Sequence, residues 1–502
     1  MCARAVRESA KEVIIVLVHT MERGMGKLNY RSLAVLAFIS AVLLRVLLCW
    51  ANPPGNAFDN HFKPIFLIMD LGAVPAKDAC WQCYQPPVFY WMSAVAGDIA
   101  VSLGMGFPQL LKLFQFISCF YGILTVGVVY LILRKLPLSD FARLISFGVV
   151  CFLPRHIYMS AMNSNDTMSY LFVALSIYLL LTAIERGFDR PILVITGIIV
   201  SITLFTKYTT YVMLPVILVT LIPLSYGQTA IPRRRVLTAV ALVFLVPLAI
   251  LGVYFADNVR KYGDMLPSNV KDEHYVKVQP RDSGGLDFFS FKPWESITAP
   301  VLVPGKMHSV WTLVYGGMWF DNEPKFLYYL DLNSDWWTHY AAWLKGEGKF
   351  PGENPAMSKL ARLTGAGLAG LGLLPLLLGL TGVVVFFRKS RERWGAADGM
   401  DAVKMNMFPV LLSGNAASIM ALALKSHIYG SVKASYFLNS LPAFAVFLGL
   451  GLMACEENRK FRISVSIVFA ILFALAGLHI LHIFSCLSAN PELRRSFLSV
   501  IF

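Results

Sequence analysis

Blocks of about twenty consecutive, mostly apolar residues recur along this chain, and an α-helix of that length crosses the hydrocarbon core of a bilayer. Hydrophobic residues make up 57% of the 502 positions and charged residues 15%, against about 45–50% and about 25% in a soluble domain. The sequence therefore predicts an all-α polytopic membrane protein. We place eleven transmembrane helices at 32–50, 108–133, 141–159, 168–185, 191–206, 209–225, 236–256, 362–387, 405–424, 435–455 and 463–486.

The apolar segment 86–105 is not counted as a span. It begins with Pro86-Pro87 and carries Asp98 in its middle, and an ionisable side chain at bilayer depth is costly. We expect this segment to lie in the outer interface; if it crossed, the protein would have twelve spans. Eleven spans put the run Arg233-Arg234-Arg235 on the cytoplasmic side, as the positive-inside rule requires, whereas twelve would turn it outward.

This topology divides the chain into five parts. They are a cytoplasmic or interfacial N-terminal helix (1–31), a transmembrane module with its first outer loop at 51–107 (32–256), a second outer-face loop domain or lid (257–361), the C-terminal transmembrane helices (362–486) and an outer-face tail (487–502). Most positive residues lie in short loops between spans, so the net charge of +14 reflects membrane topology and does not indicate nucleic-acid binding.

Most of the eight cysteines are scattered, and several fall inside predicted spans, where cysteine behaves as a small apolar residue. Cys80 and Cys83 form a close pair in the first outer loop. The two alternatives for this pair are a disulfide and a metal site, although no second Cys/His pair lies nearby in the sequence to complete a metal site.

The first outer loop is the richest in side chains that can perform chemistry. Asp59 follows the first span by a few residues, so it lies near the membrane surface, where a carboxylate can take a proton from an acceptor hydroxyl or amine. The alternative is a solvated loop aspartate or a helix N-cap. Arg45, late in the first span, is expected to snorkel outward.

The loop also carries Asp70-Leu71-Gly72 and Tyr84-Gln85-Pro86-Pro87-Val88-Phe89-Tyr90-Trp91. In order and spacing these segments and Asp59 resemble the GT-C superfamily of polyprenyl-phosphate-sugar-dependent glycosyltransferases, in the branch of the protein O-mannosyltransferases and the lipid A aminoarabinose transferases. The resemblance implies that Asp59 is the catalytic base and places His61, Tyr84 and Gln85 at the sugar or acceptor pocket. Some relatives carry lysine where this chain has Gln85, so a phosphate contact there would be a neutral hydrogen bond.

Three further groups of polar residues lie between spans on the predicted outer face. Arg155, His156 and Asp166 lie between the third and fourth spans, and a cation at that depth requires an anion or water. Arg155 is assigned to the donor phosphate, and His156 and Asp166 to the sugar or acceptor pocket. The alternative for Asp166 is that it favours the positive N-terminal end of the next helix.

The other two groups are basic. Lys207 lies between two spans, and Lys425, Lys433 and Tyr436 precede the span at 435–455 or lie at its start. Both groups resemble family segments that would bind the donor phosphate. The alternative is interfacial anchoring by lysine and tyrosine.

These assignments predict a hexosyl- or pentosyltransferase that takes its sugar from a polyprenyl (undecaprenyl or dolichyl) phosphate and passes it to a protein, lipid or glycan. An inverting displacement would occur at the periplasmic, extracellular or lumenal face of a bacterial plasma membrane or the endoplasmic reticulum. No cofactor is implied with certainty, no metal ligands are assigned, and dependence on a divalent cation stays open. The rival is a secondary transporter or lipid flippase, which would place its ionisable residues at mid-membrane on broken helices.

Overall fold

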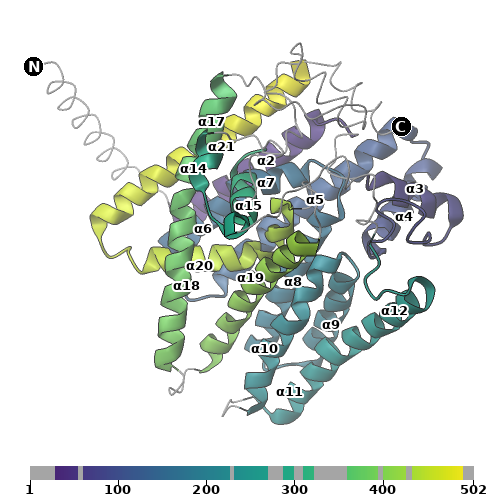
Figure 1. Cartoon of the computed structure of the whole chain (residues 1–502). Coiled ribbons are helices and arrows are strands. Elements are labelled where there is room, and N and C mark those ends of the chain that lie inside the picture. The colour runs from purple at the N-terminus through teal and green to yellow at the C-terminus, as the bar shows by residue number, and fades with distance from the viewer. Residues whose placement is uncertain are drawn as a thin grey trace, which may run out of the picture.

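The computed structural model of the protein describes residues 29–54, 60–226, 231–268, 286–298, 309–321, 359–393, 399–425 and 432–489. Over these ranges the regular secondary structure is helical, without a strand (Figure 1). This confirms the all-α prediction. The N-terminal segment before residue 29, most of the predicted outer domain 257–361 and the tail after 489 lie outside the described residues.

The helices follow one another closely along the chain. The first half contains α2 (Tyr30–Ala51), α3 (Phe62–Leu71), α4 (Val88–Ser102), α5 (Phe107–Arg134), α6 (Asp140–Phe152), α7 (Pro154–Ser160), α8 (Asn165–Glu185), α9 (Arg190–Leu204), the 3-10 helix η1 (Tyr208–Val212), α10 (Met213–Tyr226), α11 (Arg233–Ala239), the π-helical turn η2 (Val240–Leu245) and α12 (Val246–Tyr262). The second half contains η4 (Leu286–Phe289), α14 (Pro293–Thr298), α15 (Val310–Trp319), α17 (Lys359–Leu371), α18 (Leu373–Arg393), α19 (Gly399–Lys425), the 3-10 helix η6 (Ala434–Ser440), α20 (Leu441–Met453) and α21 (Arg459–Ala489).

Each of the eleven predicted spans coincides with helix. Within the described residues, eight helical stretches are long and apolar enough to cross a membrane. The predicted spans 141–159, 191–206 and 209–225 correspond to shorter elements, namely α6 with α7, α9, and η1 with α10. The uncounted segment 86–105 forms α4, which is also one of the shorter apolar helices, with 15 residues.

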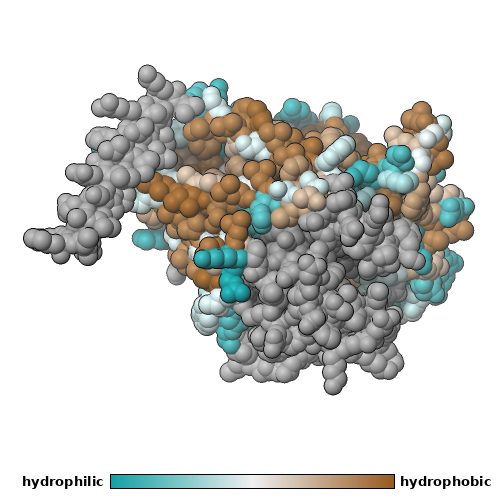
Figure 2. All heavy atoms as spheres, turned by 90° about the horizontal axis from the view of Figure 1, so that it is seen from above, coloured by the Kyte–Doolittle hydropathy of each residue, from teal (hydrophilic) through white to brown (hydrophobic). Residues whose placement is uncertain are grey.

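The outer surface of the helices is apolar, as contact with lipid requires. On α2, the side chains of Val35, Leu36, Ile39 and Leu43 are exposed, while Arg45 and the small or apolar residues of the opposite face are buried. A helix that is apolar on both faces belongs in a membrane or a large core. Figure 2 shows hydrophobic residues covering much of the visible surface outside the grey atoms.

Loops that were predicted to be cytoplasmic meet at one end of the bundle. Glu185, at the end of α8, accepts hydrogen bonds from Lys135 at 2.5 Å and forms an ion pair with Lys404 at 3.5 Å. Arg235 Nη1 donates to the carbonyl oxygen of Gly187 at 3.1 Å. Residues that the charge pattern assigned to one side of the membrane therefore lie together in the structure.

The third predicted span is broken between α6 and α7, and Arg45 closes the break. Pro154 has no backbone N–H and cannot continue the hydrogen bonding of α6, while an unpaired carbonyl in a membrane interior costs several kcal/mol. The Arg45 guanidinium donates to the carbonyl oxygen of Cys151 at 3.0 Å and contacts His156 Nδ1 at 2.7 Å. The expectation that Arg45 snorkels outward is therefore wrong, because both terminal nitrogens of its guanidinium bond inside the bundle, where the residue is fully buried.

Replacing Arg45 with methionine should lower the free energy of unfolding by about 3 kcal/mol, since carbonyl groups and an imidazole at the break lose their buried donor. The thermal midpoint of the protein in detergent measures the effect. Arg31→Met is the matched control, because Arg31 is exposed at the start of the same helix, and it should leave the midpoint nearly unchanged. Equal losses in the two variants would contradict the role given to Arg45.

Candidate active site

A buried ion pair lies at the start of α8. Lys207 Nζ donates to Asp166 Oδ1 at 2.6 Å, and both side chains are less than a tenth exposed. Asp166 stands in the first turn of α8, which Ser164 caps by accepting from the Asp166 backbone N–H at 3.2 Å. Ser164 also donates to Asp166 Oδ2 at 2.9 Å. Both carboxylate oxygens are therefore hydrogen bonded, and the charge is balanced by the lysine.

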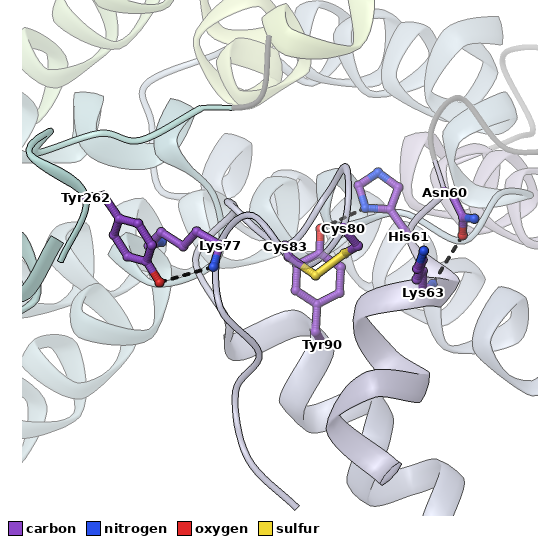
Figure 3. The surroundings of a disulfide bond; sticks show 8 residues. All are labelled: Asn60, His61, Lys63, Lys77, Cys80, Cys83, Tyr90 and Tyr262. Atoms are coloured by element: carbon purple, nitrogen blue, oxygen red, sulfur yellow. Dashed lines mark hydrogen bonds between the residues drawn. A yellow bond between two sulfur atoms is a disulfide. The ribbon is translucent and has the colours of Figure 1, made fainter. Parts of the chain in front are cut away.

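The first outer loop reaches this ion pair through His61. His61 Nε2 lies 3.5 Å from Ser164 Oγ, and its Nδ1 forms a 2.9 Å hydrogen bond with the Tyr90 hydroxyl (Figure 3). His61 precedes α3 and Tyr90 lies in α4, so the histidine joins both short helices of the loop to the start of α8. His61 is 2% exposed.

The other side of the ion pair is formed by η6. Lys207 Nζ lies 4.8 Å from the centre of the Tyr436 ring, a cation–π distance. Tyr170 of α8 donates from its hydroxyl to the carbonyl oxygen of Ser435 at 2.8 Å, which fixes η6 against α8. Lys433 is the N-cap residue of η6 and is buried. Two of the predicted phosphate residues, Lys207 and Tyr436, are thus in contact, and Lys433 lies three residues from Tyr436.

An apolar cavity of about 350 Å³ adjoins η6 on the side of α15, α18 and α20. Its walls include Trp311, Trp319, Leu380, Phe437 and Phe444, and nearly all of its lining is hydrocarbon. Tyr436 contacts the ion pair, and Phe437, the next residue of η6, lines the cavity. The same short helix therefore borders both.

Arg155 and His156 lie on α7, and both are fully buried. Arg155 Nε donates to the carbonyl oxygen of Gly317 in α15 at 2.6 Å, so one of its donors is used by the protein itself. His156 is held by Arg45 and lies 5.9 Å, centre to centre, from the Tyr170 ring. The structure thus places His156 at the helix break, with Tyr170 between it and η6.

Tyr84 and Gln85 are close to η1. The Tyr84 carbonyl oxygen accepts from the Tyr208 hydroxyl at 2.8 Å, and Tyr208 is the neighbour of Lys207. The Gln85 side chain is buried, and its Oε1 has no hydrogen-bond partner among the described residues.

Lys425, in contrast, is exposed at the end of α19. Asp59 lies outside the described residues.

Lys77 fastens the first outer loop to η1 and α12, although sequence reasoning did not select it. Its Nζ lies 2.5 Å from the Tyr254 hydroxyl and 3.0 Å from the Tyr84 carbonyl oxygen. Its backbone N–H donates to the Tyr262 hydroxyl at 3.2 Å (Figure 3). Burial lowers the pKa of Lys77 from 10.5 to about 8, although the negative charge of Asp257 opposes the shift.

Cys80 and Cys83 form a disulfide within the same loop (Figure 3). Of the two alternatives left by the sequence, the structure has the disulfide. No group of three histidine, cysteine or carboxylate side chains that could hold a metal ion occurs in the described part of the chain.

The sequence-predicted residues His61, Asp166, Lys207 and Tyr436 are therefore brought together. Ser164, Tyr90 and Tyr170 complete the same cluster, and sequence reasoning missed them. One signal was available for Ser164, since serine directly before a helix start is a common N-cap. A signal was also available for Tyr90, which stands in the family-like segment Tyr84–Trp91, whereas Tyr170 lies within a helix and carries no comparable signal.

Replacing one partner of the ion pair should lower the free energy of unfolding more than replacing both partners. Lys207→Met leaves a buried carboxylate without its cation and should destabilise the protein by about 3–5 kcal/mol. Adding Asp166→Asn should recover part of that loss. Thermal midpoints of the two singles and the double give the coupling energy. Arg260→Met, at an exposed pair with Asp257, is the control and should change the midpoint little. A double variant less stable than the additive sum would contradict this account.

The stability that Lys77 contributes should depend on pH. With a pKa of about 8 in the folded protein and 10.5 ordinarily, the unfolded chain binds more protons between these values, so stability rises with pH across that window. Thermal midpoints from pH 7 to 9.5 should therefore climb in the native protein relative to Lys77→Met. Parallel curves for the two proteins would show that the residue does not titrate in this window.

Comparison with known proteins finds a family that is similar to one region of this chain. Residues 84–252, which are less than half of the chain, match the family described as dolichyl-phosphate-mannose-protein mannosyltransferase. The matched region contains Asp166 and Lys207 but neither His61 nor Tyr436. The comparison with curated proteins found no match.

Solved structures align with this chain at low identity and with TM-scores below 0.5. The oligosaccharyltransferase of Archaeoglobus fulgidus in the apo form aligns with 14% identity and a TM-score of 0.49 over 90% of this chain, which spans 56% of the archaeal chain. The same values describe AglB of that organism in complex with an inhibitory peptide and a dolichol-phosphate. ArnT from Cupriavidus metallidurans bound to undecaprenyl phosphate aligns with 14% identity and a TM-score of 0.32, over 84% of this chain and 78% of that one. The resemblance to the protein O-mannosyltransferases is thus confirmed over residues 84–252, where this chain is similar to the family described as dolichyl-phosphate-mannose-protein mannosyltransferase.

Proposed function

We propose that the protein transfers a sugar from a polyprenyl phosphate to a protein, lipid or glycan acceptor at the outer face of its membrane. The observation that carries the proposal is the buried Asp166–Lys207 pair, with His61 on one side and Tyr436 on the other, beside an apolar cavity. A lipid-phosphate sugar needs both environments at once, since its phosphate is charged and its tail is hydrocarbon. The family description of residues 84–252, which names dolichyl-phosphate mannose, supports such a donor.

The reaction would be a single displacement with inversion at the anomeric carbon. The acceptor oxygen or nitrogen forms the new bond to that carbon as the bond from carbon to phosphate oxygen breaks, and the lipid phosphate leaves with the electron pair. Negative charge therefore grows on the phosphate, and cations that stabilise it lower the barrier. Lysine has three N–H donors. Lys207 gives one to Asp166, and we assign the others to the phosphate, with Lys433 and Arg155 adding positive charge.

Asp59 is the best candidate for the base that removes the acceptor proton. It precedes His61 by two residues, and two consecutive peptide units span at most about 7.6 Å between α-carbons. On this ground we assign Asp59 to the same site as His61. Asp166 is less suited to the role, because Lys207 and Ser164 already occupy its carboxylate oxygens. We assign Asp166 to holding Lys207 in place.

The isoprenoid tail would lie in the apolar cavity beside η6. A chain of hydrocarbon units gains about 25 cal/mol for each Å² removed from water but forms no hydrogen bonds, and this cavity offers almost none. The Cys80–Cys83 disulfide supports an outward-facing site, because disulfides persist in extracytoplasmic compartments.

Asp59→Asn tests the proposal. The variant should lose sugar transfer by about 10²–10⁴-fold, the usual contribution of a general base, while it binds dolichyl phosphate as the native protein does. The measurement is transfer of radiolabelled sugar from dolichyl-phosphate mannose or glucose to membrane acceptors, with binding measured separately in nanodiscs. Asp70→Asn is the control, since Asp70 is an exposed carboxylate of the same loop, and it should keep full activity.

Two outcomes would contradict the proposal. Unchanged transfer by Asp59→Asn removes this residue from the mechanism. Movement of dolichyl phosphate across vesicle membranes by the native protein, with no sugar transfer from either donor, would favour the rival reading of a lipid flippase.

A further inference from the structure

Two asparagines beside the ion pair hold polar atoms that the protein leaves unused. Asn163 is fully buried, and neither its Nδ2 nor its Oδ1 has a hydrogen-bond partner among the described residues. Asn165 is also fully buried, and its Oδ1 lacks a partner in the same part of the chain. More than nine in ten buried polar groups in proteins are paired, and an unpaired one costs about 1–3 kcal/mol. A side chain with both polar atoms unpaired therefore needs a reason.

Ser164, between the two asparagines, ties them to the candidate site. It lies in the short extended segment between α7 and α8, with φ −158° and ψ 142°. Asn165 reaches the carbonyl oxygen of Thr206 through Nδ2 at 3.4 Å, directly before Lys207. The two asparagines accordingly flank the Ser164 hydroxyl that binds Asp166, and the Asn165 carboxamide reaches the segment that carries Lys207.

The chemistry of a carboxamide selects among the parts of a lipid-linked sugar. A phosphate diester accepts hydrogen bonds at neutral pH but donates none, and an isoprenoid tail neither accepts nor donates them. A sugar hydroxyl both donates and accepts, and a carboxamide offers an acceptor oxygen and two N–H donors that match it in both directions. The unpaired atoms comprise two oxygens and one amino group, which can serve two neighbouring hydroxyls.

We propose that Asn163 and Asn165 bind the hydroxyl groups of the donor sugar and so form the subsite that distinguishes a sugar-bearing lipid from the bare lipid phosphate. This inference rests on the function proposed above and specifies the part of the substrate that these residues contact. Asn163 carries most of the interaction, because Asn165 has already given a donor to Thr206.

Stability gives the first test. The buried, unpaired carboxamide of Asn163 destabilises the protein when no ligand is bound. Leucine has the same branching of heavy atoms without the polar groups, so Asn163→Leu should raise the thermal midpoint or leave it unchanged. Asn163→Ala is the second variant, in case the larger carbons of leucine do not fit. Asn258 is the matched control. It is buried, but its Nδ2 donates to the Met265 carbonyl oxygen at 3.0 Å, so Asn258→Leu and Asn258→Ala should lower the midpoint. A fall at position 163 as large as at 258 would show a structural role and overturn the inference.

Binding gives the second test, with the full chain in nanodiscs and three probes: dolichyl phosphate, dolichyl-phosphate mannose and dolichyl-phosphate glucose. The native protein should bind one sugar-bearing lipid about tenfold or more tighter than dolichyl phosphate, and Asn163→Ala should abolish that preference while affinity for dolichyl phosphate stays within about twofold. Asn258→Ala should keep the preference.

The outcomes separate this inference from the proposed function. If Asn163→Ala retains the preference, or if the native protein binds all three lipids equally, the sugar subsite is wrong and the lipid-phosphate site stands. If the native protein binds none of the three, the proposed function fails and the inference falls with it.

Discussion

The ion pair between Asp166 and Lys207 is the constraint on which the arrangement of the site depends. Neither charge could remain buried without the other, because an isolated ion in a protein interior costs several kcal/mol. Their 2.6 Å contact therefore fixes the start of α8 against η1. Ser164 and His61 extend the hydrogen bonds into the first outer loop, and the Tyr436 ring covers the lysine from η6. Four segments far apart in sequence meet at one pair of charges.

Three of these segments reach the site at a place where helical geometry is interrupted. Lys207 precedes η1, Lys433 precedes η6, and the Asn163–Asn165 turn follows the short helix α7. Irregular backbone is tolerated at membrane depth only where its polar groups find partners inside the protein. Arg45 supplies such partners at the break between α6 and α7, and Asn52 donates to the carbonyl oxygen of Ala161 at 2.8 Å. Residues remote from the chemistry thus allow the chain to bend toward it.

Apolar periodicity predicts the helices of this protein well, because a long apolar block has few alternatives in a bilayer. Charge counting likewise groups the loops of Lys135, Glu185 and Arg235, which the structure brings together. The sequence does not predict whether a polar side chain lies at the lipid interface or inside the protein. Arg45 could snorkel or cap a helix break, and the choice depends on a proline more than a hundred residues away. The position of Lys77 depends on Tyr84 of its own loop and on Tyr254 and Tyr262 of α12, and no local sequence pattern predicts that these residues come together.

Broken helices with buried ionisable residues also occur in transporters, where they line a passage that opens alternately to each side. In this protein the broken segments are tied down by specific contacts. The carbonyl oxygen of Cys151 is held by Arg45, that of Ser435 by the Tyr170 hydroxyl, and that of Tyr84 by Tyr208. Such contacts oppose the rearrangement that alternating access requires, and they favour a rigid, preorganised site of the kind that stabilises a transition state. Among the buried polar atoms that lack a partner in the described part of the chain, those of Asn163 and Asn165 flank Ser164, whose hydroxyl binds Asp166, and this is where we propose that the substrate binds.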